Sequence, residues 1–135
     1  MGEFERMDAA LDRIASALLP RLYIAGPMTG LPEFNYPAFN AAEKQLWKAG
    51  FTNIFNPASL PVNPDWGWVD YIRRDIPHLC RCNAIALLPG WEKSKGANLE
   101  LRIAEELQMQ MIFVDMVGLE IVNMAECIKM AIGEE

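Results

Sequence analysis

Along this chain, short runs of apolar residues alternate with longer stretches in which apolar residues recur at helical spacing. Runs of the first kind predict strands at residues 22–25, 51–55, 84–88 and 111–114. Stretches of the second kind predict helices at residues 3–19, 35–49, 66–80, 97–108 and 119–132. Strands that alternate with helices predict an α/β fold of three layers, flavodoxin- or Rossmann-like, with helices on both faces of a parallel sheet.

The predicted helix at residues 66–80 carries apolar and charged residues on different faces. The side chains expected against the sheet are Trp68, Tyr71 and Ile72. The side chains expected to point outward are Asp70, Arg73 and Arg74. Pro77 lies inside this helix and predicts a kink or an early break, because proline lacks the backbone N–H that the helix needs.

Length and charge restrict the class of protein. The chain is expected to form one domain, residues 1–135, in which residues 1–20 form an N-terminal helix. The formal net charge of −6 argues against binding to duplex nucleic acid, because phosphate neutralisation dominates that affinity. No apolar run approaches the length that spans a bilayer, and the acidic N-terminus is unlike a signal peptide. We therefore expect a cytoplasmic protein that binds a small molecule and not a membrane.

Cysteine and histidine are too few to suggest a metal centre. Cys80, Cys82 and Cys127 are an odd number of thiols, which is not typical of a disulfide framework. His78 is the single histidine, so a zinc site would need carboxylates to complete its ligands. We therefore expect reduced cysteines near a helix end and no metal site.

Three loops, at residues 26–30, 56–58 and 90–96, follow predicted strands. Ligands of parallel α/β sheets bind beyond the carboxyl ends of the strands, so these loops are expected to converge on one site. Ser94, Lys95 and Gly96 lead into a helix start, where the N–H groups of Ala97 and Asn98 could hold an anion. The alternative is an ordinary strand-to-helix loop with a solvated lysine.

Neither glycine-containing loop matches a common nucleotide-binding motif. Ala97 follows Gly96 where a Walker loop requires lysine, and residues 26–30 do not form G-x-G-x-x-G. Kinase, ATPase and dinucleotide-binding functions therefore lose their main support.

Three side chains near these loops are candidates for chemistry. Glu100 falls in the first turn of a predicted helix, whose dipole would keep the carboxylate ionised; the alternative is a structural residue that offsets the dipole. Asp75 lies on the helix at residues 66–80, and its alternative is a surface ion pair with Arg74. Tyr23 lies on the first strand close to the Gly26 loop, and its alternative is core packing.

Four segments of the sequence together resemble a known family. The opening Tyr23-Ile24-Ala25-Gly26-Pro27-Met28, followed by Asn56-Pro57, Asp75 and Ser94-x-Gly96-Ala97-x-x-Glu100, is similar to the nucleoside 2-deoxyribosyltransferase-like superfamily. That superfamily includes the deoxyribonucleoside 5'-monophosphate N-glycosidases. The similarity covers about residues 22–114 and is greatest to a small branch frequent in phage and prophage genomes.

The resemblance implies a role for each matching residue. Glu100 would be the nucleophile at the anomeric carbon, Asp75 would assist the base, and Tyr23 would orient the nucleophile. The loop with Ser94, Gly96 and Ala97 would hold the 5' end of the sugar. The loop bordering the sugar and base would consist of Gly26, Pro27 and Met28.

The implied function is cleavage or transfer of the N-glycosidic bond of a deoxyribonucleoside or its 5'-monophosphate. Lys95 in the anion loop favours the monophosphate, and the reaction needs no metal or redox cofactor. Relatives often borrow a pocket residue from a neighbouring subunit, so a homodimer or higher homo-oligomer is expected. The alternatives are a non-catalytic protein that binds a nucleotide or nucleotide signal in the same pocket, or a small structural protein.

Overall fold

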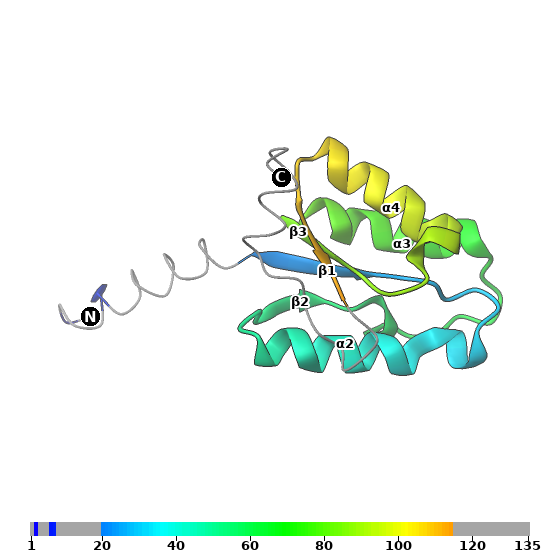
Figure 1. The fold of residues 1–135 in the computed structure, drawn as a ribbon, viewed down its shortest axis with the longest axis horizontal. Helices are drawn as coiled ribbons and strands as arrows, with labels where there is room; N and C mark the ends of the chain where they lie inside the picture. Colours follow the sequence, from blue (N-terminus) through cyan, green and yellow to red (C-terminus); the bar gives the residue numbers. More distant parts are fainter. Residues whose placement is uncertain (1, 3–5, 8–19, 115–135) are drawn as a thin grey trace.

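The computed structural model describes residues 2, 6–7 and 20–114. Four strands form one parallel sheet in the order β2-β1-β3-β4: β1 (Arg21–Ala25), β2 (Asn53–Phe55), β3 (Ala84–Leu87) and β4 (Gln110–Phe113). The helices are α2 (Tyr36–Lys48), α3 (Trp68–Cys80) and α4 (Lys95–Glu106). Helix α2 covers one face of the sheet, and α3 and α4 cover the other (Figure 1). The three-layer α/β fold expected from the sequence is confirmed.

Most predicted elements are present with shifted ends, and two lie outside the described residues. Apart from residues 6–7, the helices predicted at residues 3–19 and 119–132 lie outside the residues that the structure describes. Helix α2 ends before Gly50, which has φ +106° and fits the predicted stop. Helix α4 begins at Lys95 instead of residue 97, because the Ser94 hydroxyl accepts the Ala97 N–H at 3.1 Å and caps it.

The early break predicted at Pro77 is wrong. Helix α3 continues through Pro77 to Cys80 and closes with the Arg81 N–H on the His78 carbonyl at 3.1 Å. The proline lies in the last turn and is exposed, so the helix loses one hydrogen bond without burying an unpaired carbonyl.

No helix of the described residues is long and apolar enough to span a membrane.

Strand order places a topological switch point between β1 and β3. The chain leaves β1 toward α2 on one face of the sheet, and leaves β3 toward α4 on the other face (Figure 1). The connections from these two neighbouring strands therefore diverge and open a crevice at their carboxyl ends. The loops at residues 26–30 and 90–96 meet there, as the sequence predicted. The predicted convergence of the loop at residues 56–58 is wrong: it follows the edge strand β2, and none of its residues lines the cavity described below.

Side chains of the strands alternate between two buried clusters. Leu22 and Ile24 of β1 pack toward α2, with Phe39, Ala42 and Leu46 of that helix. The cluster on the opposite face joins β1 and β3 to α3 and α4; it contains Tyr23, Ala25, Leu79, Ile85, Leu87, Leu101, Ala104 and Met109. The strands are thus buried on both faces, as their continuous apolar runs predict.

Candidate functional site

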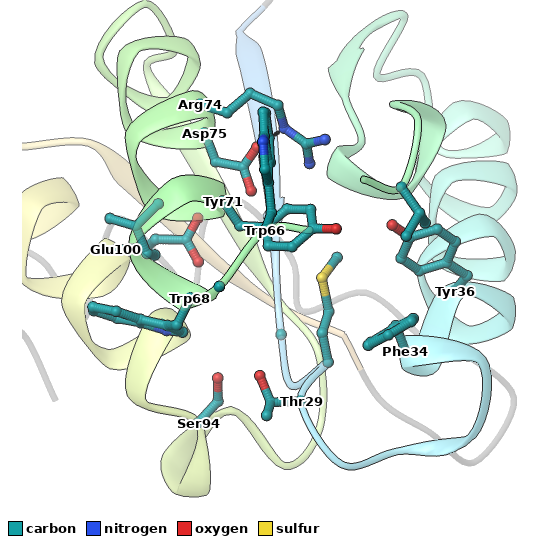
Figure 2. A pocket seen from close by; sticks show the side chains of 16 residues that line it. Thr29, Phe34, Tyr36, Trp66, Trp68, Tyr71, Arg74, Asp75, Ser94 and Glu100 are labelled. Atoms are coloured by element: carbon teal, nitrogen blue, oxygen red, sulfur yellow. Dashed lines mark hydrogen bonds and ion pairs between the residues drawn. The ribbon is translucent and has the colours of Figure 1, made fainter. Parts of the chain in front are cut away.

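A cavity of about 240 Å³ lies at the carboxyl ends of β1 and β3 (Figure 2). Its wall includes segments that follow β1, the loop before α3, α3 itself, and the start of α4. The lining residues are Gly26, Met28, Thr29, Phe34, Tyr36, Val62, Trp66, Gly67, Trp68, Tyr71, Ile72, Arg74, Asp75, Ser94, Gly96 and Glu100. This volume is near the lower end of the range for small-molecule sites, which suits a compact metabolite better than a dinucleotide.

Close packing of two loops explains the glycine at position 26. A Cβ at Gly26 would lie 2.7 Å from the Cβ of Leu88, which directly follows β3. Only glycine lets the chain leaving β1 pass this close to the end of β3. The contact therefore fixes one wall of the cavity, from which Met28 and Thr29 continue.

Phe34 is held at the cavity wall by strained backbone. Glu33, Phe34 and Asn35 have φ values of 53°, 52° and 61°, in the left-handed region that residues with a Cβ seldom adopt. The Asn35 amide donates to the Pro27 carbonyl at 2.9 Å and ties this turn to the loop after β1. The turn thus directs Phe34 and Tyr36 to the side of the cavity facing Glu100 (Figure 2).

Glu100 is one of two buried carboxyl groups of the cavity, and its pKa does not fit the ionised form expected from the helix dipole. The side chain comes from the second turn of α4 and only 7% of the residue is exposed. Burial raises the pKa of Glu100 to about 8; the negative charge of Asp75 adds to this increase, and a hydrogen-bonding contribution from Tyr23 opposes it. Desolvation, the largest contribution, therefore favours a protonated Glu100 near neutral pH, opposite to the ionised form expected from the helix start.

Asp75 is a buried partner of Arg74, so the surface ion pair considered for it is not what forms. Asp75 is 7% exposed, and the Arg74 Nε donates to its Oδ1 at 2.8 Å. Burial raises the pKa of Asp75, while the hydrogen bond and charge of Arg74 lower it. The outward orientation predicted for Arg74 is also wrong, because Arg74 is half-buried and lines the cavity.

Tyr23 lies beneath the two carboxyl groups instead of in the cavity wall. Its ring is fully buried and stacks on Phe55 with a centroid distance of 5.3 Å. The hydroxyl makes no hydrogen bond of regular geometry among the described residues. It is nonetheless close enough to Glu100 to affect that group: burial, with the charges of Glu100 and Asp75, raises the pKa of Tyr23 well above its usual value. The hydroxyl is therefore a neutral donor facing Glu100.

The anion site predicted at Ser94, Lys95, Gly96 and the following N–H groups does not form as expected. The N–H groups of Ala97 and Asn98 are occupied by the Ser94 hydroxyl at 3.1 Å and the Ser94 carbonyl at 3.0 Å, so these two donors are not available. Lys95 does not line the cavity; its Nζ lies 4.0 Å from the ring centroid of Trp68 in a cation–π contact. What remains for a ligand is the first-turn N–H of Gly96 together with the Ser94 hydroxyl.

Of the ten residues predicted for the site, six line the cavity: Gly26, Met28, Asp75, Ser94, Gly96 and Glu100. The other four, Tyr23, Pro27, Lys95 and Ala97, lie behind or beside it. Ala97 and Tyr23 are completely buried, and the Pro27 carbonyl holds Asn35. These four support the wall instead of facing a ligand.

Trp66, Trp68 and Tyr71 form an aromatic wall of the cavity, and the sequence did not predict them as site residues. Trp68, Tyr71 and Ile72 line the cavity instead of packing against the sheet, and Trp66 joins them from the loop before α3. Trp66 meets Tyr71 edge-on with a centroid distance of 5.2 Å. Tyr71 donates to the Asn63 carbonyl at 2.9 Å and accepts the Asn63 N–H at 3.1 Å, which fixes the loop. The density of tryptophan between residues 66 and 68 was the available signal.

Among the described residues, no group of His, Cys, Asp and Glu side chains is arranged to hold a metal ion. His78 stacks on Phe55 with a centroid distance of 4.1 Å, and Cys80 and Cys82 are free thiols. The chemistry available to the cavity is therefore that of two buried carboxyl groups, one guanidinium, hydroxyl groups and aromatic surfaces.

Comparison with known proteins supplies a family but not an activity. No curated protein and no solved structure matches the chain. A family described as a domain of unknown function, DUF4406, matches residues 20–113, which include every element around the cavity. The chain therefore belongs to the DUF4406 family.

Proposed function

We propose that this protein cleaves, or transfers between bases, the N-glycosidic bond of a deoxyribonucleoside or its 5'-monophosphate. The observation that carries the proposal is the meeting of Glu100 and Asp75, from α4 and α3, in a single cavity above the hydroxyl of Tyr23. A carboxylate below the sugar ring stabilises an oxocarbenium-like transition state and can bond to the anomeric carbon. The resemblance to the nucleoside 2-deoxyribosyltransferase-like superfamily implies the same roles.

The arrangement of side chains supports one orientation of the substrate. Ser94 and Thr29 place hydroxyl groups at one end of the cavity, Arg74 and Asp75 lie at the opposite end, and Glu100 lies between them (Figure 2). The 5' end of the sugar would meet Ser94 and the Gly96 N–H. The base would lie toward Arg74 among the aromatic side chains, whose flat surfaces favour stacking.

The reaction would proceed in two balanced steps. The ionised Glu100 oxygen bonds to the anomeric carbon while the bond to the base nitrogen breaks, and the protonated Asp75 gives its proton to that nitrogen. Water then attacks the anomeric carbon, Asp75 accepts a proton from it, and Glu100 leaves as a carboxylate. With a second base in place of water, the same second step yields a new nucleoside.

This mechanism requires one proton on the carboxyl pair, placed on Asp75. Burial raises the pKa of Glu100 to about 8 and also raises the pKa of Asp75, so the two groups titrate as a coupled pair, and the reactive arrangement is one of its two singly protonated forms. Activity should therefore have a bell-shaped pH profile: it falls at low pH when both groups are protonated, and above about pH 8 when both are ionised.

One observation favours a second function, binding of a nucleotide or nucleotide-derived signal without turnover. A Glu100 that is protonated at pH 7 is a hydrogen-bond donor and not a nucleophile. Such a group, with Ser94 and the aromatic wall, could hold a sugar without reacting. The two functions make opposite predictions for base release.

The experiment is incubation with 2'-deoxynucleosides and their 5'-monophosphates, with and without an acceptor base, followed by chromatography of free and exchanged bases. Glu100→Gln should lower kcat/KM by on the order of 10³-fold or more, because it removes the nucleophile at nearly constant shape. Glu105→Gln, at an exposed position of the same helix, is the matched control and should leave the rate unchanged. Ligand binding without release or exchange of base would favour the second function and overturn the first.

Two further expectations accompany the proposal. A homo-oligomer would place a second copy near the cavity mouth, where Leu31, Phe34 and Val62 are exposed. Light scattering of the purified chain measures its oligomeric state and tests whether it forms a homo-oligomer. The cytoplasmic location stays a prediction from the sequence.

A further inference from the structure

Arg74 is fixed at the base end of the cavity by contacts on three sides. Its Nε donates to Asp75 Oδ1 at 2.8 Å, and its Nη1 donates to the Pro61 carbonyl at 3.0 Å. The guanidinium carbon lies 5.2 Å from the ring centroid of Tyr71 and 5.7 Å from that of Trp66. A side chain of this length is ordinarily mobile, so these contacts predefine where its remaining donors point.

Of the five guanidinium N–H donors, three remain: the second N–H of Nη1 and both of Nη2, for which the described residues show no hydrogen-bond partner. Two properties of the surroundings restrict what they can bind. Asp75 lies 2.8 Å from the Arg74 Nε, so an anion bound there would lie beside this acidic group, and the free N–H edge suits a neutral oxygen better. The nearby Tyr71 hydroxyl already donates its proton to the Asn63 carbonyl, so it offers the ligand no competing donor.

We infer that Arg74 determines base specificity by donating a hydrogen bond to an exocyclic carbonyl oxygen of the base. The inference rests on the proposed function, in which Asp75 is occupied with the leaving nitrogen and the exocyclic group meets Arg74. An exocyclic amino group would present donors to a guanidinium that has only donors. The site is therefore expected to favour oxo bases over amino bases.

The test compares 2'-deoxyinosine with 2'-deoxyadenosine, and the two corresponding 5'-monophosphates. These purines differ at position 6 in carrying an oxo or an amino group. Both kcat/KM by base release and Kd by calorimetry are measured. The wild-type protein should prefer the oxo purine by about 10-fold to 100-fold, the range for a hydrogen bond to a charged donor.

Arg74→Met keeps an unbranched apolar stem but removes the donors, and should reduce this preference to within about 3-fold. Because Arg74 also holds Asp75, overall activity should fall for both substrates, and only the ratio reports recognition. Arg73→Met, at the exposed neighbouring position, is the matched control and should preserve the ratio. Arg74→Lys should retain part of it, since lysine keeps the charge but not the planar fork.

Three results would overturn the inference: no oxo preference in the wild type, a ratio unchanged by Arg74→Met, or a selective loss for monophosphates irrespective of base. The last result would identify Arg74 as a phosphate ligand. The proposed function fails separately, by the absence of base release and exchange with every substrate. In that case the Kd ratio still tests Arg74, and a complete absence of binding refutes both.

Discussion

The two faces of the sheet are built from the same strands but differ in what they bury. Facing α2, β1 and β3 present Leu22, Ile24, Ala84 and Ala86 to an apolar cluster. Asn56, a buried polar residue at its edge, is uncharged, and its amide donates to Asn40 at 3.0 Å and Glu43 at 3.2 Å. This face has the composition of a core that serves stability.

Facing α3 and α4, the same sheet buries groups that cost free energy. The Tyr23 hydroxyl has no regular hydrogen bond among the described residues, and Glu100 is buried without an ion-pair partner there. Both lie near the carboxyl ends of the strands, where the connections diverge. Unfavourable burial concentrated at one edge of one face is typical of a functional site, and it distinguishes this face from the apolar face that stabilises the fold.

The largest loss of stability should come from removing a large side chain from the cluster between the sheet and α2. Phe39 is buried against β1 and β3, so Phe39→Ala should lower the free energy of unfolding by about 3–5 kcal/mol, from lost burial and the cavity that remains. Urea denaturation at pH 5 and pH 9 should give the same loss, because no carboxyl group titrates in that cluster. A loss that differs by more than about 1 kcal/mol between the two pH values would show that the faces are coupled.

The next largest effect should come from the charge of Glu100. Its pKa is about 8 in the folded protein against 4.5 for the free group, so the folded state binds the extra proton between these values. Stability is therefore highest below about pH 4.5 as far as this group is concerned, and falls as pH rises to about 8. Glu100→Gln removes this dependence.

Relative to the wild type, Glu100→Gln should be of similar stability at low pH and more stable by a few kcal/mol at pH 9. Urea titrations at successive pH values measure the difference. Glu105→Gln is the control at an exposed position and should follow the wild type throughout. A Glu100→Gln curve parallel to the wild type would mean that Glu100 titrates normally and is not desolvated.

The same contrast explains what could be predicted from the sequence. The order of strands and helices follows from apolar periodicity, and the convergence of the Gly26 and Ser94 loops follows from strand order. Helical spacing identified Trp68, Tyr71 and Ile72 as inward-facing, but a pattern cannot distinguish a packed core from the wall of a cavity.

Two site properties depend on tertiary contacts that no local pattern encodes. Arg74 lines the cavity because the Pro61 carbonyl, from a loop 13 residues earlier in the chain, accepts its hydrogen bond. Burial in the folded protein raises the pKa of Glu100 to about 8, whereas its place near a helix start suggested an ionised group. The resemblance supplied residue identities; their protonation and partners required the three-dimensional arrangement.

The smallest effect on stability should come from Tyr23→Phe, although it changes the face of the sheet that borders the cavity. The variant removes a buried hydroxyl that has no regular hydrogen bond, so the free energy of unfolding at pH 5 should change by less than about 1 kcal/mol. Tyr71→Phe is the matched control: its hydroxyl bonds twice to Asn63, and its loss should cost about 0.5–1.5 kcal/mol.

The two tyrosine variants should separate again in their pH dependence. The Tyr23 hydroxyl lowers the pKa of Glu100, so Tyr23→Phe should raise that pKa further and move the upper bend of the stability curve to higher pH. The basic limb of any base-release profile should move the same way. Tyr71→Phe should leave the bend in place. A bend that stays put in Tyr23→Phe would mean that the hydroxyl does not act on Glu100, and its burial would then be a matter of packing alone.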